Sequence, residues 1–397
     1  MASENAIHGK FEVRVINKTI VKAADPSPEP RIIRLSNLDL LSGRFPVTYI
    51  YFYRKTHSNH SISETLKDSL AQCLSHFYPF AGTISENQKS NEPEIICDNN
   101  GALVIEAQAS VHLKEFDFYD LNQSLQGKLV SIDHQFPVQV QITSFICGGV
   151  SITFTFDHAL GDASAFGKFL LTWSEIASIK PISCTPDHSR NLRARSPPSY
   201  DPSVDDEFIS CTMEDIRNIP TISILLKRLY YIDESSIGVL QGLASTNGNV
   251  LSVSFGESNV TNLKQGCIAD VADIIHKNIS MVTNEGHFRS LIDWVECHRP
   301  GLMLSKSVLG LSGPTLVISS GRRFPVAELD FGFGSPVLGT VCSTIERLGV
   351  GYINQRQSAR GDGSWTVSAI LWPEMVEALE SDPDHIFQPM NINHIQL

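Results

Sequence analysis

The sequence predicts a mixed α/β fold, in which sheets built largely from hairpins are flanked by helices. Apolar residues recur every three or four positions over residues 62–77, as in an amphipathic helix. Residues 138–145 and 151–156 instead alternate between apolar and polar, and a Gly-Gly turn separates them. Strands that follow one another directly in this way favour mixed sheets over strict β-α-β alternation.

In the first half, residues 10–22 alternate as a strand, and the Pro-rich segment 24–30 ends it. The helix over 62–77 stops at Pro79, after which a strand runs toward Ile84. The other elements expected in this half are a hairpin of residues 94–97 and 102–107, the strand pair 138–145 and 151–156, and a helix over 163–176.

Residues 181–206 are rich in Pro, Ser and Arg and have no apolar period. We expect them to form a long crossover between a first domain, residues 1–180, and a second domain, residues 207–397. The elements expected in the second domain are strands at 211–219, 223–231, 250–255, 316–319, 341–346, 351–354 and 366–371, and helices at 235–243, 269–283 and 373–380.

The composition limits the class of protein. The chain has 397 residues, of which 42% are hydrophobic and 19% charged, as is typical of globular domains. A net charge of −12 argues against a nucleic-acid partner. The absence of a long apolar run or an apolar leader argues against membrane insertion and secretion, so we expect a cytoplasmic protein. We also expect it to be a monomer.

The eight cysteines are scattered, and none forms a C-x-x-C pair. In a chain expected to be cytoplasmic, they are predicted to be reduced thiols. Cys297 and His298 are adjacent, but no second pair lies at metal-ligand spacing. We therefore expect no metal site.

The segment FDHALGDASAF, residues 156–166, contains the strongest candidate for a catalytic group. His158 directly follows an alternating strand and enters a turn at Gly161. An imidazole at a rigid strand end can face a cleft and act as a general base. The alternative is a partly buried histidine with a purely structural role.

Asp162 lies four residues after His158, a spacing that would place both side chains on one face of a helix. Gly161 argues against a regular helix there. Asp162 could therefore hold the loop, pair with a cation or contact His158.

A second motif, LDFGFGSP, spans residues 329–336. Its glycines do not complete a dinucleotide-binding fingerprint, because the third glycine is missing and Pro336 would disrupt the helix that should follow. The residues Asp330, Phe331, Gly332, Phe333 and Gly334 are interpreted as a structural turn. The chain also lacks a G-x-S-x-G nucleophile elbow and a phosphate-binding P-loop.

With these two motifs, the chain resembles the plant BAHD acyltransferases, whose signatures are HxxxD and DFGWG. Further matches are LSNLDL at 35–40, LKDSLAQCLSHFYPFAGTI at 66–84 and FICGGVSITFTFDHALGDA at 145–163. The resemblance runs from the first expected strand to the last expected helix. Within the family, segments such as CTMEDIRNIPT and ECHRPGLMLSK look most like coniferyl alcohol acyltransferases.

The resemblance implies a two-domain fold of the chloramphenicol-acetyltransferase type, with a channel between the domains. It implies no permanently bound cofactor, with acyl-CoA, expected to be acetyl-CoA, as cosubstrate and a small alcohol as acceptor. His158 would be the general base, Asp162 would support the channel through a salt bridge, and Ser319 would donate to the oxyanion. Asp330 to Gly334 would be structural, and the residues that bind CoA are not assigned.

The chain departs from the family pattern at three places. Phe333 replaces the usual Trp, and Gly321 replaces a Trp, which is expected to widen the acceptor side. Around residues 247–249 the chain lacks several dozen residues that relatives carry, including the arginine that normally pairs with the HxxxD aspartate. Arg193 and Arg195 are not convincing substitutes.

These features predict an acyl-CoA-dependent O-acyltransferase that moves an acetyl group to a phenylpropanoid alcohol such as coniferyl alcohol. A rival hypothesis is a catalytically impaired relative with a binding or regulatory role, favoured by the missing segment. An amine acceptor is a third hypothesis.

Overall fold

The computed structural model describes most of the chain. The described ranges are residues 11–26, 31–42, 44–55, 61–125, 127–190, 192–211, 225–237, 268–307, 315–321, 324–342 and 350–397. The strand expected at 250–255 lies outside them, as do most of the strand expected at 211–219 and the end of the one expected at 341–346. No helix among the described residues is long and apolar enough to cross a membrane.

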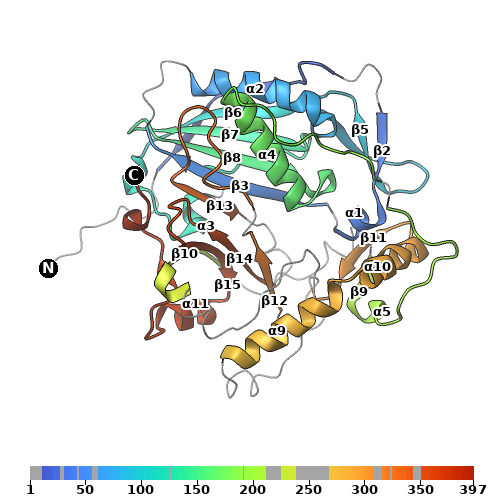
Figure 1. Cartoon of the computed structure of the whole chain (residues 1–397). Coiled ribbons are helices and arrows are strands. Elements are labelled where there is room, and N and C mark those ends of the chain that lie inside the picture. Colours follow the sequence, from blue (N-terminus) through green and yellow to red (C-terminus); the bar gives the residue numbers. More distant parts are fainter. Residues whose placement is uncertain are drawn as a thin grey trace.

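A six-stranded sheet with the order β1-β6-β7-β8-β3-β13 forms the larger layer of the molecule (Figure 1). Strands β6 and β7 pair in parallel, and the other neighbours are antiparallel. The strands are β1 (Val13–Val21), β3 (Pro46–Tyr53), β6 (Ala102–Ala109), β7 (Val138–Phe145), β8 (Val150–Asp157) and β13 (Leu338–Cys342).

The β7–β8 pair confirms the strands predicted around the Gly-Gly turn. The hairpin predicted from residues 94–97 and 102–107 is wrong, because the two strands belong to different sheets. Residues 102–107 lie in β6, whereas β5 (Pro93–Cys97) is the middle strand of a small sheet with β2 (Arg31–Arg34) and β4 (Thr83–Glu86).

The second half of the chain forms a five-stranded sheet with the order β12-β14-β15-β10-β16. It also contributes β13 to the first sheet, where residues 338–342 pair with β3. The strands of the second sheet are β10 (Leu226–Ile232), β12 (Leu316–Ser320), β14 (Gly351–Gln357), β15 (Trp365–Leu371) and β16 (Gln388–Pro389), and a separate pair consists of β9 (Phe208–Cys211) and β11 (Leu302–Ser305).

Helices α2 and α4 lie side by side over the six-stranded sheet (Figure 1). Both were predicted from the sequence, as were α9 and α11, whereas α1 and α10 were not. The helices are α1 (Asn37–Ser42), α2 (Ile62–His76), α3 (Leu121–Ser124), α4 (Ala163–Ala177), α5 (Val204–Glu207), α9 (Ile268–Val282), α10 (Glu285–His298) and α11 (Pro373–Glu380), with short 3-10 turns η1 (Tyr78–Ala81), η2 (Leu113–Glu115), η3 (His158–Leu160) and η5 (Ile392–His394).

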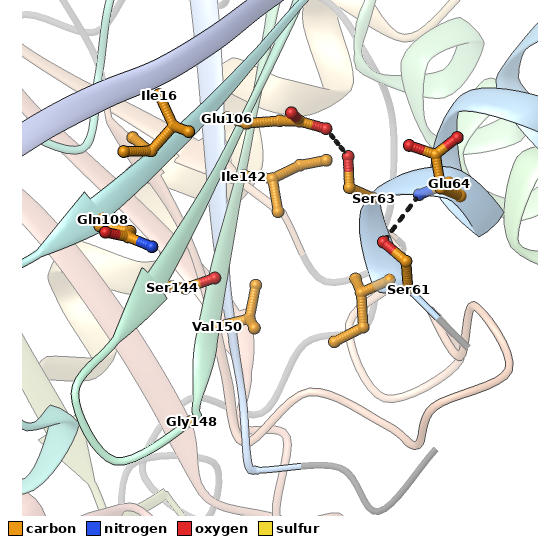
Figure 2. A pocket seen from close by; sticks show the side chains of 12 residues that line it. Ile16, Ser61, Ser63, Glu64, Glu106, Gln108, Ile142, Ser144, Gly148 and Val150 are labelled. Carbon is orange, nitrogen blue, oxygen red and sulfur yellow. Dashed lines mark hydrogen bonds between the residues drawn. The ribbon is translucent and has the colours of Figure 1, made fainter. Parts of the chain in front are cut away.

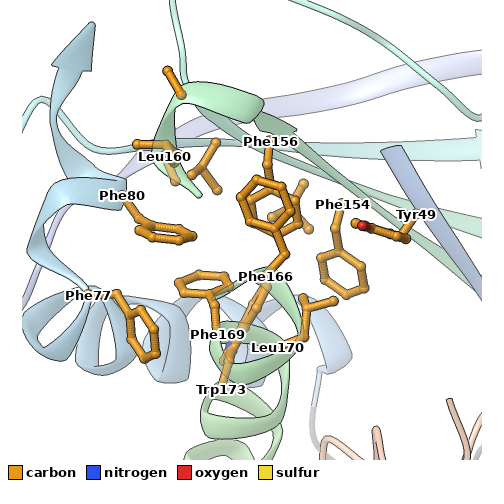
Figure 3. Packing of buried hydrophobic residues seen from close by; sticks show 14 of the residues in the cluster. Tyr49, Phe77, Phe80, Phe154, Phe156, Leu160, Phe166, Phe169, Leu170 and Trp173 are labelled. Atoms are coloured by element: carbon orange, nitrogen blue, oxygen red, sulfur yellow. The ribbon is translucent and has the colours of Figure 1, made fainter. Parts of the chain in front are cut away.

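Aromatic side chains fill the space between α4 and the sheet (Figure 3). Phe166 stacks on Phe156 of β8 with ring centroids 4.5 Å apart, and Trp173 packs edge-on against Phe154. These four side chains are buried, and burying each contributes roughly 1.5–3 kcal/mol. The packing holds β8 and α4 together on both sides of the turn that joins them.

Candidate active site

His158 is the first residue of η3, directly after β8. Its backbone N–H donates to the carbonyl of Phe45 at 3.0 Å, and its ring lies 4.7 Å from the Phe45 ring. Phe166 of α4 approaches it edge-on at 6.2 Å. The Nδ1 atom is buried and has no hydrogen-bond partner among the residues that the structure describes. The imidazole is therefore held by aromatic packing, and this nitrogen is not committed to any protein acceptor.

Burial lowers the pKa of the His158 imidazole below its usual value of 6.5, because a charged ring would lose hydration. The carboxylates of Asp162, Asp157 and Asp39 oppose the shift. The net lowering keeps the ring neutral at physiological pH. A neutral imidazole is the form that can accept a proton.

Asp157 precedes the histidine and fixes the start of the turn. Its Oδ1 accepts a hydrogen bond from the Ala159 N–H at 3.0 Å, and its Oδ2 pairs with the Arg44 guanidinium at 2.7 Å. The turn ends at Gly161, where an added Cβ would lie only 2.6 Å from the Cβ of Ala165. Two non-bonded carbon atoms cannot lie so close together, so the close packing of the turn on α4 requires glycine at position 161.

Asp162 is the N-cap of α4. Its carboxylate accepts a hydrogen bond from the Ala165 N–H at 3.0 Å, as N-cap residues commonly do. The residue is exposed, and among the residues that the structure describes no cation forms an ion pair with it. Arg195, one of the two arginines considered from the sequence, pairs instead with the buried Asp293.

Ser319 lies on β12, in the second sheet, opposite Asn354 of β14. The Asn354 amide donates to the Ser319 hydroxyl oxygen at 3.3 Å, and no acceptor for the hydroxyl proton lies among the described residues. Within the described ranges, no hydrogen bond or ring contact joins Ser319 to His158. To contact both residues, a substrate would have to reach from Ser319 on β12 to His158 on η3.

The expected widening at Gly321 is not seen, because another side chain occupies that space. A Cβ at position 321 would lie 2.7 Å from Cγ of Arg356. The Tyr49 and Phe324 rings stack on each other with centroids 4.2 Å apart, and the Arg356 guanidinium lies 4.8 and 4.4 Å from these centroids. Arg356 is 3% exposed. Gly321 therefore makes room for a buried arginine.

The Asp330–Gly334 segment forms a tight turn beside β8 and α4. The Asp330 carboxylate accepts hydrogen bonds from the N–H groups of Gly332 and Gly334 at 2.8 and 2.9 Å. Both glycines have positive φ, +91° and +105°, a conformation that disfavours other residues. Phe331 is fully buried against Trp173, and Phe333 packs on Tyr53.

A depression of about 470 Å³ lies elsewhere, between the start of α2 and the strands β1, β6, β7 and β8 (Figure 2). Glu106 accepts a hydrogen bond from Ser63 there and pairs with Lys67 at 3.1 Å. None of the predicted site residues lines it. The depression is therefore distinct from the His158 site.

Several residues that shape the site were not predicted from the sequence, including Arg44, Asn354, Arg356 and Arg190. The structure places Arg190, from the crossover, against the carbonyl of Leu160 at the end of η3. Only for Asp39, the partner of Arg190, did the sequence contain a signal, because Asp39 is a charged residue in the LSNLDL segment that matches the family.

The fold matches those of two solved structures. Vinorine synthase aligns with a TM-score of 0.66 and 18% identity, over 95% of this chain and 99% of that one. F. graminearum TRI101, complexed with coenzyme A and T-2 mycotoxin, aligns with a TM-score of 0.67 and 12% identity, over 90% and 99%. The protein therefore has the mixed α/β, two-domain fold of the chloramphenicol-acetyltransferase type.

The family model described as "Transferase family" matches residues 11–247 and 242–386. The chain belongs to this family, the plant BAHD acyltransferases, which use acyl-CoA as donor. It is 25% identical to shikimate O-hydroxycinnamoyltransferase of Nicotiana tabacum, over 93% of this chain and 99% of the relative. It is 28% identical to the fatty alcohol:caffeoyl-CoA acyltransferase of Arabidopsis thaliana, over 83% and 89%.

The alignment with the Nicotiana relative extends over 436 positions, more than the 397 residues of this chain. Gaps therefore fall within this chain. The two segments matched by the family model meet at residues 242–247, next to the place where we expect the chain to be shorter than its relatives.

Proposed function

We propose that the protein transfers an acetyl group from acetyl-CoA to the hydroxyl of a phenylpropanoid alcohol such as coniferyl alcohol, with His158 as general base. The observation that carries this proposal is the His158 ring itself. It stands at the end of a buried strand, its Nδ1 has no partner in the described part of the chain, and burial lowers its pKa. A neutral, rigidly positioned imidazole is suited to accept a hydroxyl proton.

The proposed reaction needs neither a metal nor a covalent enzyme intermediate. The imidazole takes the acceptor proton as the oxygen attacks the thioester carbonyl, and the tetrahedral intermediate expels CoA thiolate, to which the imidazolium returns the proton. Ser319 would donate to the oxyanion, a role supported by its uncommitted hydroxyl proton. Asp162 and the Asp330–Gly334 turn would act structurally, as a helix cap and a packing element.

The direct test is an assay of the purified chain with a matrix of donors and acceptors. Acetyl-CoA would be compared with coumaroyl-CoA, caffeoyl-CoA and benzoyl-CoA, because the relatives include hydroxycinnamoyltransferases and an anthranilate N-benzoyltransferase of Dianthus caryophyllus. Coniferyl alcohol would be compared with shikimate, a long-chain alcohol and anthranilate. Preferred turnover of acetyl-CoA with coniferyl alcohol would support the proposal, and preference for an amine or another donor would overturn that part of it.

A second candidate is a catalytically impaired member of the family. The gaps in the alignment and the lack of a cation beside Asp162 among the described residues favour it. The test compares the chain with a version into which the corresponding segment of a relative has been inserted. Higher turnover and a higher melting temperature in the restored version would support impairment. Equal values would show that the segment is dispensable.

A further inference from the structure

The crossover between the two halves contacts the turn that carries His158. The Nη2 atom of Arg190 donates to the carbonyl of Leu160 at 2.9 Å and to that of Ala159 at 3.3 Å. The Nη1 atom of the same side chain pairs with Oδ1 of Asp39 on α1 at 2.5 Å. One guanidinium therefore connects η3, the crossover and α1.

Asp39 is itself fixed in place. Its Oδ2 accepts hydrogen bonds from the backbone N–H of Ser36 at 2.7 Å and from the Ser36 hydroxyl at 2.6 Å. The side chains of Arg190 and Asp39 are only 17% and 19% exposed. A partly buried pair with additional hydrogen bonds is screened less by solvent than a surface pair, so it can maintain a defined geometry.

The carbonyls that Arg190 binds belong to the last two residues of η3. A three-residue 3-10 turn cannot satisfy the carbonyls at its own end, and they need donors from elsewhere. Arg190 supplies these donors within two residues of the imidazole. Any rotation of η3 would break its hydrogen bonds to the guanidinium.

We propose that Arg190, held by Asp39, is a positioning residue that sets the orientation and the charge environment of His158. This inference rests on the proposed function. Arg190 touches the turn rather than the reacting groups, so it would act through the geometry of His158. The crossover would then be part of the catalytic scaffold and not only a connection between the halves.

The charged groups around His158 determine how the loss of Arg190 should change the protonation of the imidazole. Asp157 at the end of β8 is paired with Arg44, Asp162 caps α4, and Asp39 on α1 is paired with Arg190. The other neighbours, Phe45 and Phe166, are uncharged. Removal of Arg190 would leave the Asp39 carboxylate without its cation, and an uncompensated negative charge favours the protonated imidazole.

The test compares Arg190→Gln with Arg193→Gln, a control on an exposed arginine three residues away whose guanidinium donates to the Arg190 backbone carbonyl at 3.4 Å. With the donor and acceptor that the wild-type chain turns over, R190Q should lower kcat roughly 10- to 100-fold with little change in the KM for acyl-CoA. The acid limb of its pH profile should move to higher pH. The double variant R190Q/D39N should return that limb toward its original position, which a general loss of structure would not do.

A second measurement does not depend on activity. The His158 imidazole would be titrated by NMR, with its signal assigned from His158→Ala. The pKa should rise in R190Q by about one unit or less and stay unchanged in R193Q. If R190Q does not fold, Arg190→Lys keeps the charge but cannot bind both carbonyls and Asp39, so it should lower kcat without raising the pKa.

An unchanged His158 pKa and unchanged kcat in R190Q, or an unchanged kcat in R190K where only that variant folds, would overturn the proposal. If the wild-type chain shows no transferase activity, the proposed function fails, while the NMR titration of R190Q, or of D39N, still tests the Arg190–Asp39 arrangement. In D39N the pKa should fall, because a negative charge near the ring is removed.

Discussion

The turn that carries His158 is packed more tightly than the outer part of the second half, which here means α9 and β12. In β8, the side chains from Val150 to Phe156 are buried, and α4 buries Phe166 and Trp173 completely. By contrast, α9 leaves Ile275 45% exposed. Further exposed apolar side chains of this part are Ile274 and Met281 of α9 and Ile318 of β12.

This contrast indicates in which region a substitution should lower the stability of the fold and in which it should not. The turn is held by backbone hydrogen bonds, two arginines and a close contact with α4, so small changes there should be costly. The outer part lies beyond the junction at 242–247 and presents apolar surface that nothing in the described part of the chain covers. Changes on that surface should cost little.

His158→Ala should lower kcat by roughly 10²- to 10⁴-fold and leave the fold intact, because it removes the proposed base but only part of a ring contact. In the wild-type chain, activity should fall as pH drops through the His158 pKa, which lies below 6.5, because protonated imidazole cannot accept a proton. Steady-state kinetics would be compared with those of His134→Ala, an exposed control. Wild-type turnover in H158A would remove this residue from the mechanism.

Gly161→Ala should destabilise the fold by about 1–3 kcal/mol, because its Cβ would collide with that of Ala165. The collision should also displace the His158 turn and reduce turnover. Urea unfolding and kinetics would be measured for G161A, for Ala165→Gly and for the double variant. Since A165G removes the colliding atom, the double variant should be more stable than the sum of the single effects predicts. Simple additivity would argue against the close contact.

Asp162→Ala should cost about 0.5–2 kcal/mol, the usual effect of losing an N-cap. Asp162→Asn should be nearly neutral, because an amide oxygen can accept the same hydrogen bond from Ala165. Thermal unfolding of both variants separates a cap from an ion pair. A loss of about 3–5 kcal/mol in each would mean that a cation pairs with Asp162 after all.

Ile275→Lys should change the free energy of unfolding by less than about 0.5 kcal/mol, because the side chain is already largely in solvent. Ile292→Lys on α10 provides the buried counterpart, and it should be strongly destabilising. Chemical unfolding of the two variants measures the difference. A large effect of I275K would show that the α9 surface is covered in solution.

Local patterns were enough to predict much of the site. The alternation of residues 151–156 and the helical period of 163–176 placed His158 between a strand and a helix, as the structure has it. Such periodicities depend only on neighbouring residues. The glycines of the 330–334 segment likewise predicted a tight turn, since positive φ angles favour glycine wherever they occur.

The pairing of strands that are distant in the sequence could not be predicted from local patterns. Strand β3 was missed because residues 48–53 are all buried, so no alternation marks it. The predicted 94–107 hairpin failed because β5 and β6 pair with strands distant in sequence rather than with each other. Sequence proximity cannot reveal which partner buries more surface.

Local sequence was sufficient for the family signatures, the strand and helix around His158, and the residue types available for catalysis. The surroundings of the base depend instead on tertiary contacts. Arg190 and Asp39 lie far apart in the chain, and their contact at η3 exists because the crossover folds back over α1. Likewise, Gly321 and Arg356 meet because β12 and β14 pair in parallel. Charge pairing and shape complementarity act through space, so they become defined only once the chain has folded.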